Sequence, residues 1–508
     1  MEFQQAIDSS LPDGSLKRPP KMDIVLLGGA LGSLFSILQF IASPVIGKLS
    51  DVLGRRRVLL VSMLGNLVSC GVWLFSNTFE LFVLSRVIGG LSEGNVQLSI
   101  AMISDITTTE TRSHGLAMVG IAFAIAFTVG PALGAYFANK DLVAAFPGLA
   151  QYGLHPFSGS ALLALVLLMV ECLYLYFNLP ETNSESWRNA VQKKQIQEGS
   201  AGKEGSKDQP QPHANGRPSE SAKQSLTTPM VQTDPESIFR LQDSYLARLS
   251  FTHFAHLFLF SGMEFTLTFL TFHLFDFTHM QQGALLGYIG ILSSLIQGGY
   301  VRRRAHKVGE KTMVIQGMAA AAVGLGCIAI VSSSSSSGSI ADEQLSHANS
   351  GTFAMYHNLV FWLETQDWSQ RSRMWGLYAG ATGLAVTSAT VVNCLTSLTS
   401  LVCDMGLDIA SDSQSSSSSA PSVPGRRYQP IGKGLALGRF RSWGQLGRAL
   451  GPIAACSLYW RVGPLVCYGA ASLSVAVITL LSSRILPEVR RLPIRSGPAS
   501  AGLAKKHS

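Results

Sequence analysis

Long apolar stretches constrain the fold of this 508-residue chain more than any other feature of its sequence. Most of them exceed the roughly 18 residues that a helix needs to cross a bilayer. Only 14% of the residues are charged, whereas a soluble domain has about one-quarter. The sequence therefore predicts an all-α polytopic membrane protein with eleven spans, at residues 24–46, 58–76, 80–103, 115–137, 159–179, 250–275, 283–301, 312–331, 374–402, 434–459 and 463–483.

Polar segments divide these spans into two groups. Residues 183–249 are rich in Gln, Ser, Pro, Lys and Glu and too poor in aliphatic residues to form a core, so they predict a disordered linker. The linker separates an N-terminal half-bundle of five spans from a C-terminal half-bundle of six. The predicted organisation is a polar segment at 1–23, half-bundles at 24–182 and 250–489, serine-rich loops at about 332–350 and 411–424, and a tail at 490–508.

Lysine and arginine concentrate in alternate loops, including Lys48, Arg55 to Arg57, Arg302 to Arg304, the linker and the tail. The positive-inside rule places these loops and the C-terminus on the cytoplasmic side of the membrane. The membrane itself is expected to be the plasma membrane or an internal membrane. Basic residues before the first span then fall outside, and an even number of helices would remove that conflict. The net charge of +8 thus reflects topology, and we expect no nucleic-acid partner.

The sequence shows no catalytic triad, no phosphate-binding glycine loop and no metal-ligand cluster. The seven cysteines lie mostly in apolar stretches without paired spacing, which is typical of buried packing residues. The chain is therefore not expected to be an enzyme, and we predict no catalytic residue, cofactor or metal. Its expected partners are the lipid bilayer and a small-molecule substrate, and we expect a monomer.

Short sequences recur between the two halves. His114-Gly-Leu-Ala returns as Lys433-Gly-Leu-Ala, and Leu179-Pro-Glu returns as Leu486-Pro-Glu. Two homologous halves are the architecture in which a transporter binds its substrate between them, near the middle of the bilayer.

Three motifs resemble, in the right order, those of the major facilitator superfamily. They are Gly47-Lys-Leu-Ser-Asp-Val-Leu-Gly-Arg-Arg-Arg57, Leu84-Ser-Arg-Val-Ile-Gly-Gly90 and Gly130-Pro-Ala-Leu-Gly134. Within the superfamily the chain resembles the tetracycline-resistance and tetracycline transporter-like drug:proton antiporters most. The resemblance implies a two-half bundle of twelve helices. Only one span precedes the first motif, so helix 1 of the usual twelve is apparently missing.

The resemblance implies roles for two of these motifs. The first, with Gly47, Asp51, Gly54, Arg55 and Arg56, implies a cytoplasmic latch that stabilises the outward-facing state. Glycine suits a reversal close to another helix, and Asp51 can face a helix N-terminus. The third, with Gly130, Pro131 and Gly134, is the antiporter-type helix motif, where proline and small residues permit a kink and close helix contact.

Arg86, Gly90, Glu93 and Gln97 are spaced by four, three and four residues, which predicts that they share one helix face. An ionised group inside a bilayer is costly and usually pairs or faces water. Arg86 and Glu93 are therefore either proton-coupling residues, as the resemblance implies, or a structural ion pair. Gln97 is a candidate for the substrate cavity. Glu264, in an aromatic span, is the third proton-coupling candidate.

A second stripe consists of Arg441, Gln445 and Arg448, spaced by four and three residues. Two cations on one face favour an anionic ligand, although Arg441 also has the reach to extend into the cytoplasm. Gln445 and Arg448 are substrate-cavity candidates, and Trp443 is a third that would stack on an aromatic ligand.

These features predict a proton-coupled secondary transporter that exports amphipathic drugs or organic anions by alternating access. Two alternatives remain. A sugar-like nutrient facilitator is one, because Leu179-Pro-Glu-Thr182 also resembles sugar carriers. A non-transporting, degenerate carrier that acts as a membrane scaffold is the other, because of the missing helix.

Overall fold

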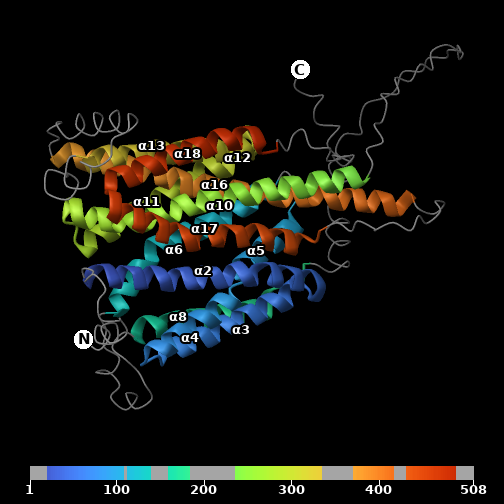
Figure 1. The fold of residues 1–508 in the computed structure, drawn as a ribbon. Coiled ribbons are helices and arrows are strands. Elements are labelled where there is room, and N and C mark those ends of the chain that lie inside the picture. The colour runs from blue at the N-terminus through green and yellow to red at the C-terminus, as the bar shows by residue number, and fades with distance from the viewer. Residues whose placement is uncertain are drawn as a thin grey trace, which may run out of the picture.

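A computed structural model of the chain describes residues 20–107, 111–138, 158–182, 235–333, 370–416 and 431–487. All regular structure in these ranges is helical, and the helices lie roughly parallel in one bundle (Figure 1). The linker at 183–234, much of both serine-rich loops and the tail lie outside the described residues.

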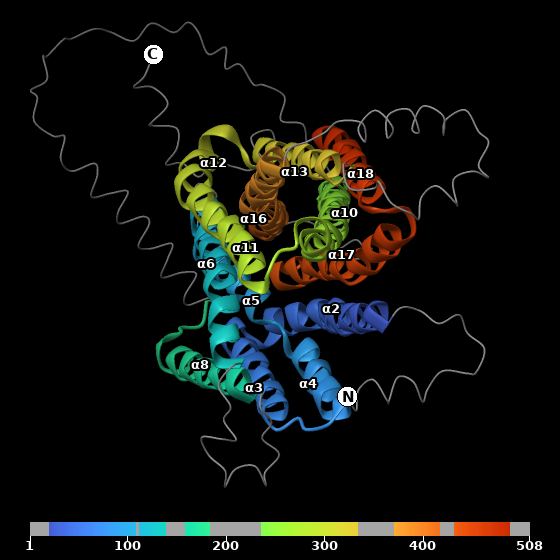
Figure 2. The same cartoon turned by 90° about the vertical axis from the view of Figure 1, so that its left-hand side faces the viewer.

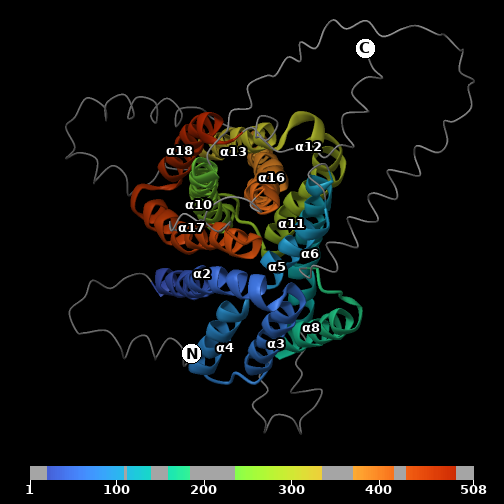
Figure 3. The ribbon, with the colours of Figure 1, turned by 90° about the vertical axis from the view of Figure 1, so that its right-hand side faces the viewer.

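Two groups of helices are visible when the bundle is viewed along its axis (Figures 2 and 3). The first group contains α2 (Pro20–Leu53), α3 (Arg55–Leu74), α4 (Phe79–Ser92), α5 (Asn95–Ile106), α6 (Arg112–Ala138) and α8 (Ser158–Asn178). The second group contains α10 (Pro235–Phe275), α11 (His279–Ile296), the π-helix η2 (Gln297–Val301), α12 (Arg302–Val308), α13 (Glu310–Ser333), α16 (Gln370–Ser416), α17 (Lys433–Val462) and α18 (Pro464–Ile485). These groups are the two predicted halves.

Eight helices among the described residues are long and apolar enough to cross a membrane. The other predicted spans coincide with the pair α4 and α5, which are short, with α17, which is more polar, and with α6, which contains an apolar helical stretch at His114–Gly130. Large apolar side chains are exposed on the outer surfaces of the bundle, among them Leu64 on α3, Leu167 on α8 and Leu480 on α18. Such a surface suits contact with lipid, where the backbone of each helix is satisfied internally.

The predicted span at 80–103 is broken in its middle. Helix α4 ends at Ser92, Glu93 has non-helical angles (φ −73°, ψ 83°), and Gly94 caps α5. A Cβ at Gly94 would lie 2.6 Å from Ser62 Oγ, so glycine allows the close approach of α3 here. The break resets the helical register, so Arg86 does not share a face with Glu93 and Gln97 as the spacing predicted.

Two helices are longer than their predicted spans. Helix α10 begins at Pro235, so residues 235–249, assigned to the linker from the sequence, are helical. This segment is polar on average, but Gln242 and Leu249 are buried on one side of it, which is the pattern of an amphipathic helix. Helix α16 continues to Ser416, into the predicted serine-rich loop, where no proline or other strong breaker interrupts it.

Helix α17 packs between α2 of the first half and α10 of the second. Glycines make both contacts: a Cβ at Gly47 would overlap the carbonyl of Gly434, and a Cβ at Gly447 would lie 2.6 Å from the carbonyl oxygen of Phe254. Small residues that let backbones approach are typical of helix contacts in membranes. The Ser33 and Ser442 hydroxyls add hydrogen bonds of 2.7 and 2.6 Å across the α2–α17 contact.

Candidate functional site

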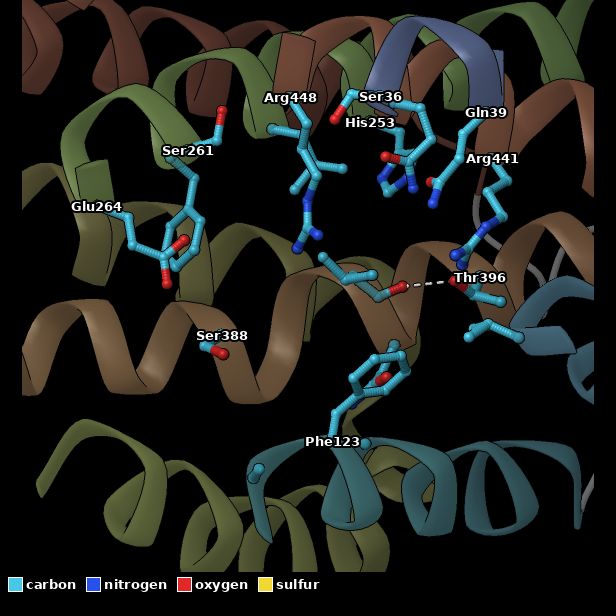
Figure 4. A pocket seen from close by; sticks show the side chains of 18 of the residues that line it. Ser36, Gln39, Phe123, His253, Ser261, Glu264, Ser388, Thr396, Arg441 and Arg448 are labelled. Atoms are coloured by element: carbon cyan, nitrogen blue, oxygen red, sulfur yellow. Dashed lines mark hydrogen bonds between the residues drawn. The ribbon is translucent and has the colours of Figure 1, made fainter. Parts of the chain in front are cut away.

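A cavity of about 820 Å³ lies between the two halves. Its walls come from α2, α5 and α6 on one side and from α10, α11, α16 and α17 on the other. Phenylalanines contribute much of the lining, including Phe35, Phe123 and Phe265, and polar side chains converge on the interior (Figure 4). A largely apolar cavity with a few placed polar groups is the usual form of a small-molecule site.

Helix α17 supplies the positive charge of this cavity. Arg441, Gln445, Arg448 and Pro452 all line it, because spacings of four, three and four keep them on one face. The guanidinium groups of Arg441 and Arg448 project from the helix into the cavity (Figure 4). Arg441 Nε is buried and has no hydrogen-bond partner among the described residues. This donor is available to a bound molecule.

Each half contributes one carboxylate to the cavity. Glu93, at the break between α4 and α5, lies close enough to Arg441 for a Coulombic interaction and accepts a hydrogen bond of 3.3 Å from Asn66 Nδ2. Glu264, on α10, lies close enough to Arg448 for a Coulombic interaction. The cavity therefore holds two carboxylates, one from each half, and two guanidinium groups, both of them on α17.

Two of the predicted site residues lie outside the cavity. The guanidinium group of Arg86 lies 5.1 Å from the ring of Trp73 on α3 and 5.3 Å from that of Phe82 on its own helix, α4, in two cation–π contacts. Trp443 is 45% exposed and meets Phe254 edge-on at 6.0 Å. Trp443 follows Arg441 by two residues, which places it on the opposite side of the helix.

Several cavity residues were not predicted from the sequence, among them Gln39, Gln297 and Asn393, which line the cavity from α2, η2 and α16. His253 lines it from α10. His253 is buried, stacks on the ring of Phe440 at 4.2 Å and has an unpartnered Nδ1 atom among the described residues. A polar side chain within an apolar span was the available signal for each, but the spacing within a span does not reveal which other helix it faces.

The end of the bundle where α2 ends and α17 begins is held together by Asp51; we call it the Asp51 end. Asp51 Oδ1 and Oδ2 accept hydrogen bonds of 2.9 and 2.8 Å from the backbone N–H groups of Gly434 and Leu435, at the N-terminus of α17. A carboxylate stabilises a helix N-terminus by satisfying free N–H groups and by opposing the helix dipole. One side chain of the first half thus caps a helix of the second.

The other residues of the first motif surround this contact. Arg55 is 2% exposed and forms ion pairs with Asp51 at 2.8 Å and Asp105 at 3.1 Å. Gly54 has a φ of +97°, a conformation that favours glycine. The Glu181 carboxylate accepts hydrogen bonds from the backbone N–H groups of Arg55 and Arg56, at 2.9 and 3.1 Å. The recurrent Leu-Pro-Glu sequence therefore anchors the start of α3.

More ion pairs cross between the halves at the Asp51 end. Asp404 of α16 pairs with Arg112 of α6 across the halves and, at 2.6 Å, with Lys433 of α17 within the second half. Lys433 Nζ also lies 3.8 Å from Asp105. We call Asp51, Arg55, Asp105, Arg112, Asp404 and Lys433 the inter-half network. This network holds the halves together at one end of the cavity.

The predicted antiporter-type helix motif lies in α6, which runs through position 131 as a continuous helix. A Cβ at Gly130 or Gly134 would meet no described atom within 4 Å. The close helix contact expected there is therefore not made by the described residues.

A comparison with known proteins identifies the family. A model described as Major Facilitator Superfamily matches residues 25–390. The chain belongs to the major facilitator superfamily. This confirms the two-half helical fold and makes the protein an integral multi-pass transporter of a small-molecule substrate, rather than an enzyme.

Three individual matches add detail to the superfamily assignment. The major facilitator superfamily domain-containing protein 10 of Mus musculus is 31% identical over 470 residues, or 92% of this chain and 81% of that protein. The crystal structure of the human organic anion transporter MFSD10 (TETRAN) has a TM-score of 0.60 and 28% identity, covering 95% of this chain and 89% of that one. The class E tetracycline resistance protein of Escherichia coli is 30% identical over 118 residues, 23% of this chain and 29% of that protein.

Proposed function

We propose that the protein transports amphipathic organic anions by alternating access and binds them in the cavity between its halves. The two guanidinium groups of Arg441 and Arg448 in that cavity are the observation that carries this proposal. They suit a carboxylate, sulfonate or phosphate, while the phenylalanine walls suit an aromatic or aliphatic body. Similarity to the human organic anion transporter MFSD10 favours the same substrate class.

Transport is coupled to protons through Glu93 and Glu264. The negative charges of these carboxylates offset the positive charges of Arg441 and Arg448 in the same cavity and so oppose binding of an anion. Protonation of a carboxylate removes that opposition, so a proton and an anion favour each other's binding. Exchange of drugs against protons, which the resemblance to the tetracycline antiporters implies, would instead require the two to compete. The two carboxylates and two guanidinium groups in one cavity therefore favour movement of anion and proton in the same direction.

The Asp51 end faces the cytoplasm, because Lys48, Arg55 to Arg57 and Arg302 to Arg304 lie toward it. The inter-half network closes this end in the present state. In an alternating-access cycle the network has to break before the cavity opens toward the cytoplasm.

Uptake of labelled 2-naphthalenesulfonate into proteoliposomes tests the proposal. A sulfonate stays ionised over the whole working pH range, so it does not cross the lipid as a neutral acid. We expect uptake above that of protein-free liposomes, and faster uptake with acid outside than with alkali outside. Faster uptake with alkali outside would establish exchange, and no uptake in any gradient would overturn the proposal.

Variants of α17 connect the uptake to the cavity. Arg448→Gln removes a charge-assisted hydrogen bond, so we expect the apparent affinity to fall about 10- to 100-fold. Arg461→Gln is the matched control, because Arg461 lies on the same helix, exposed and outside the cavity. Equal losses in both variants would show that the effect does not come from the cavity.

A further inference from the structure

The π-helix η2 places an amide group in the cavity wall. It interrupts the passage from α11 to α12, and its first residue, Gln297, is 3% exposed and lines the cavity. A π-helical turn adds one residue to the helical register, is rare, and occurs frequently at functional sites. The position of Gln297 therefore calls for a reason beyond packing.

The hydrogen bonding of this amide is incomplete. Gln297 Nε2 donates to Ser293 Oγ at 3.4 Å, whereas Gln297 Oε1 is buried and accepts no hydrogen bond from any described residue. Most buried polar atoms in proteins have a partner, and an unpartnered acceptor carries a cost of desolvation. Since Gln297 lines the cavity, a bound molecule is the missing partner that the geometry allows.

A second amide meets the first one. Asn393 on α16 also lines the cavity, and its Nδ2 donates a long bond of 3.4 Å to the carbonyl oxygen of Ala389. Helix α6 faces both amides with Gly120, where a Cβ would overlap both Gln297 Oε1 and Asn393 Nδ2. The absence of a side chain at Gly120 thus lets two uncharged amides from two other helical segments converge against α6.

We propose that Gln297 and Asn393 form a neutral subsite that binds a hydroxyl or N–H group of the transported anion. The inference rests on the proposed function, because the charged end of the same molecule binds Arg441 and Arg448. The preferred substrates are then aromatic anions that carry an uncharged hydrogen-bond donor away from the acidic group. A site built to accept such a hydrogen bond disfavours the analogue that lacks it.

The test is competition binding to the full-length protein in lipid nanodiscs, with labelled 2-naphthalenesulfonate as the probe. The competitors are 6-hydroxy-2-naphthalenesulfonate and 6-methoxy-2-naphthalenesulfonate, since the methoxy group keeps the oxygen and removes the donor. We expect the hydroxyl compound to bind about 3- to 10-fold more tightly than the methoxy compound. Gln297→Leu should abolish this preference, and Gln316→Leu, outside the cavity on α13, should retain it.

The ratio of the two affinities is measured on the protein that binds the probe, so partial misfolding of a variant does not distort it. Asn393→Leu provides a second variant: it removes the Nδ2 donor, whose acceptor would be the oxygen that both competitors carry, so it should weaken both of them by a similar factor and leave their ratio in place. Equal binding of the two competitors to the unaltered protein overturns the subsite alone. A preference that persists in Gln297→Leu also overturns it, and so does an unchanged affinity for both competitors in Asn393→Leu. Failure of all three sulfonates to bind overturns the proposed function itself, and the subsite with it.

Discussion

Asp51→Asn is expected to open the Asp51 end of the bundle. The Asp51 carboxylate accepts two backbone hydrogen bonds from α17 and pairs with Arg55 at 2.8 Å. Asparagine has one oxygen in place of two and no charge, so one charge-assisted hydrogen bond and the interaction with the helix dipole are lost. Their loss amounts to about 2–4 kcal/mol.

This loss changes the ratio of open to closed states directly, because Asp51 contacts α17 only while the halves are together. At 1.4 kcal/mol per factor of ten, the lower value of about 2 kcal/mol corresponds to an increase of about 30-fold in the open population. Arg55 keeps its ion pair with Asp105, so the first half retains its own packing.

Cys403 reports this change without an added label site. Its side chain is completely buried on α16, next to Asp404, and lies among the charges of Lys433 and Arg112. Alkylation by N-ethylmaleimide, quantified by mass spectrometry of the peptide, should accelerate about 30-fold in Asp51→Asn if labelling follows the open population. Cys172 on α8, which is partly exposed and packs within the first half, serves as the internal reference.

The matched control is Glu80→Gln, which removes an exposed carboxylate from the first turn of α4 without touching the second half. It should leave the labelling of Cys403 unchanged. An alkylation rate in Asp51→Asn that stays within about twofold of the unaltered protein would refute the reasoning, because it would mean that the cap contributes less than about 0.5 kcal/mol to closure.

Three further predictions concern helix packing and the cavity. Gly447→Ala should overpack the contact with α10 and reduce the free energy of unfolding by about 1–3 kcal/mol, which would appear as a lower thermal unfolding temperature in detergent. Gly469→Ala, where a Cβ meets nothing within 4 Å, should leave that temperature unchanged. Trp443→Leu should leave sulfonate affinity unchanged in the competition assay, since Trp443 lies outside the cavity; a loss of affinity would contradict that placement. Glu264→Gln should weaken the acceleration of sulfonate uptake by external acid while uptake without a gradient continues, and undiminished acceleration would remove Glu264 from the coupling.

The periodic features of the sequence predicted the fold and one wall of the cavity. Apolar stretches of sufficient length predicted the helices, and the spacing of Arg441, Gln445 and Arg448 placed them on one face because α17 is regular throughout. The same reasoning failed for Arg86 and Glu93, since the helix breaks between them. Periodicity holds only while the helical register is unbroken.

The remaining parts of the site depend on contacts between segments far apart in the sequence. Gln297 and Asn393 are 96 positions apart, and no local pattern brings their amides to Gly120. The cap that Asp51 makes on α17 joins positions 383 residues apart. The motif around Asp51 suggested a helix N-terminus as its partner, but only packing of the two halves determines which helix that is.

Helix α17 connects the Asp51 end to the cavity mechanically. Its first turn is capped by Asp51, and its guanidinium groups at Arg441 and Arg448 follow about 10 and 20 Å along the same helix. Because an α-helix is stiff along its axis, a displacement of the first turn of α17 also moves the segment that carries Arg441 and Arg448, and no chain of side-chain contacts is needed between them. Where the anion binds the open and closed states with different affinities, thermodynamic reciprocity applies: loosening the cap changes the apparent affinity for the anion, and a bound anion shifts the open population that Cys403 reports.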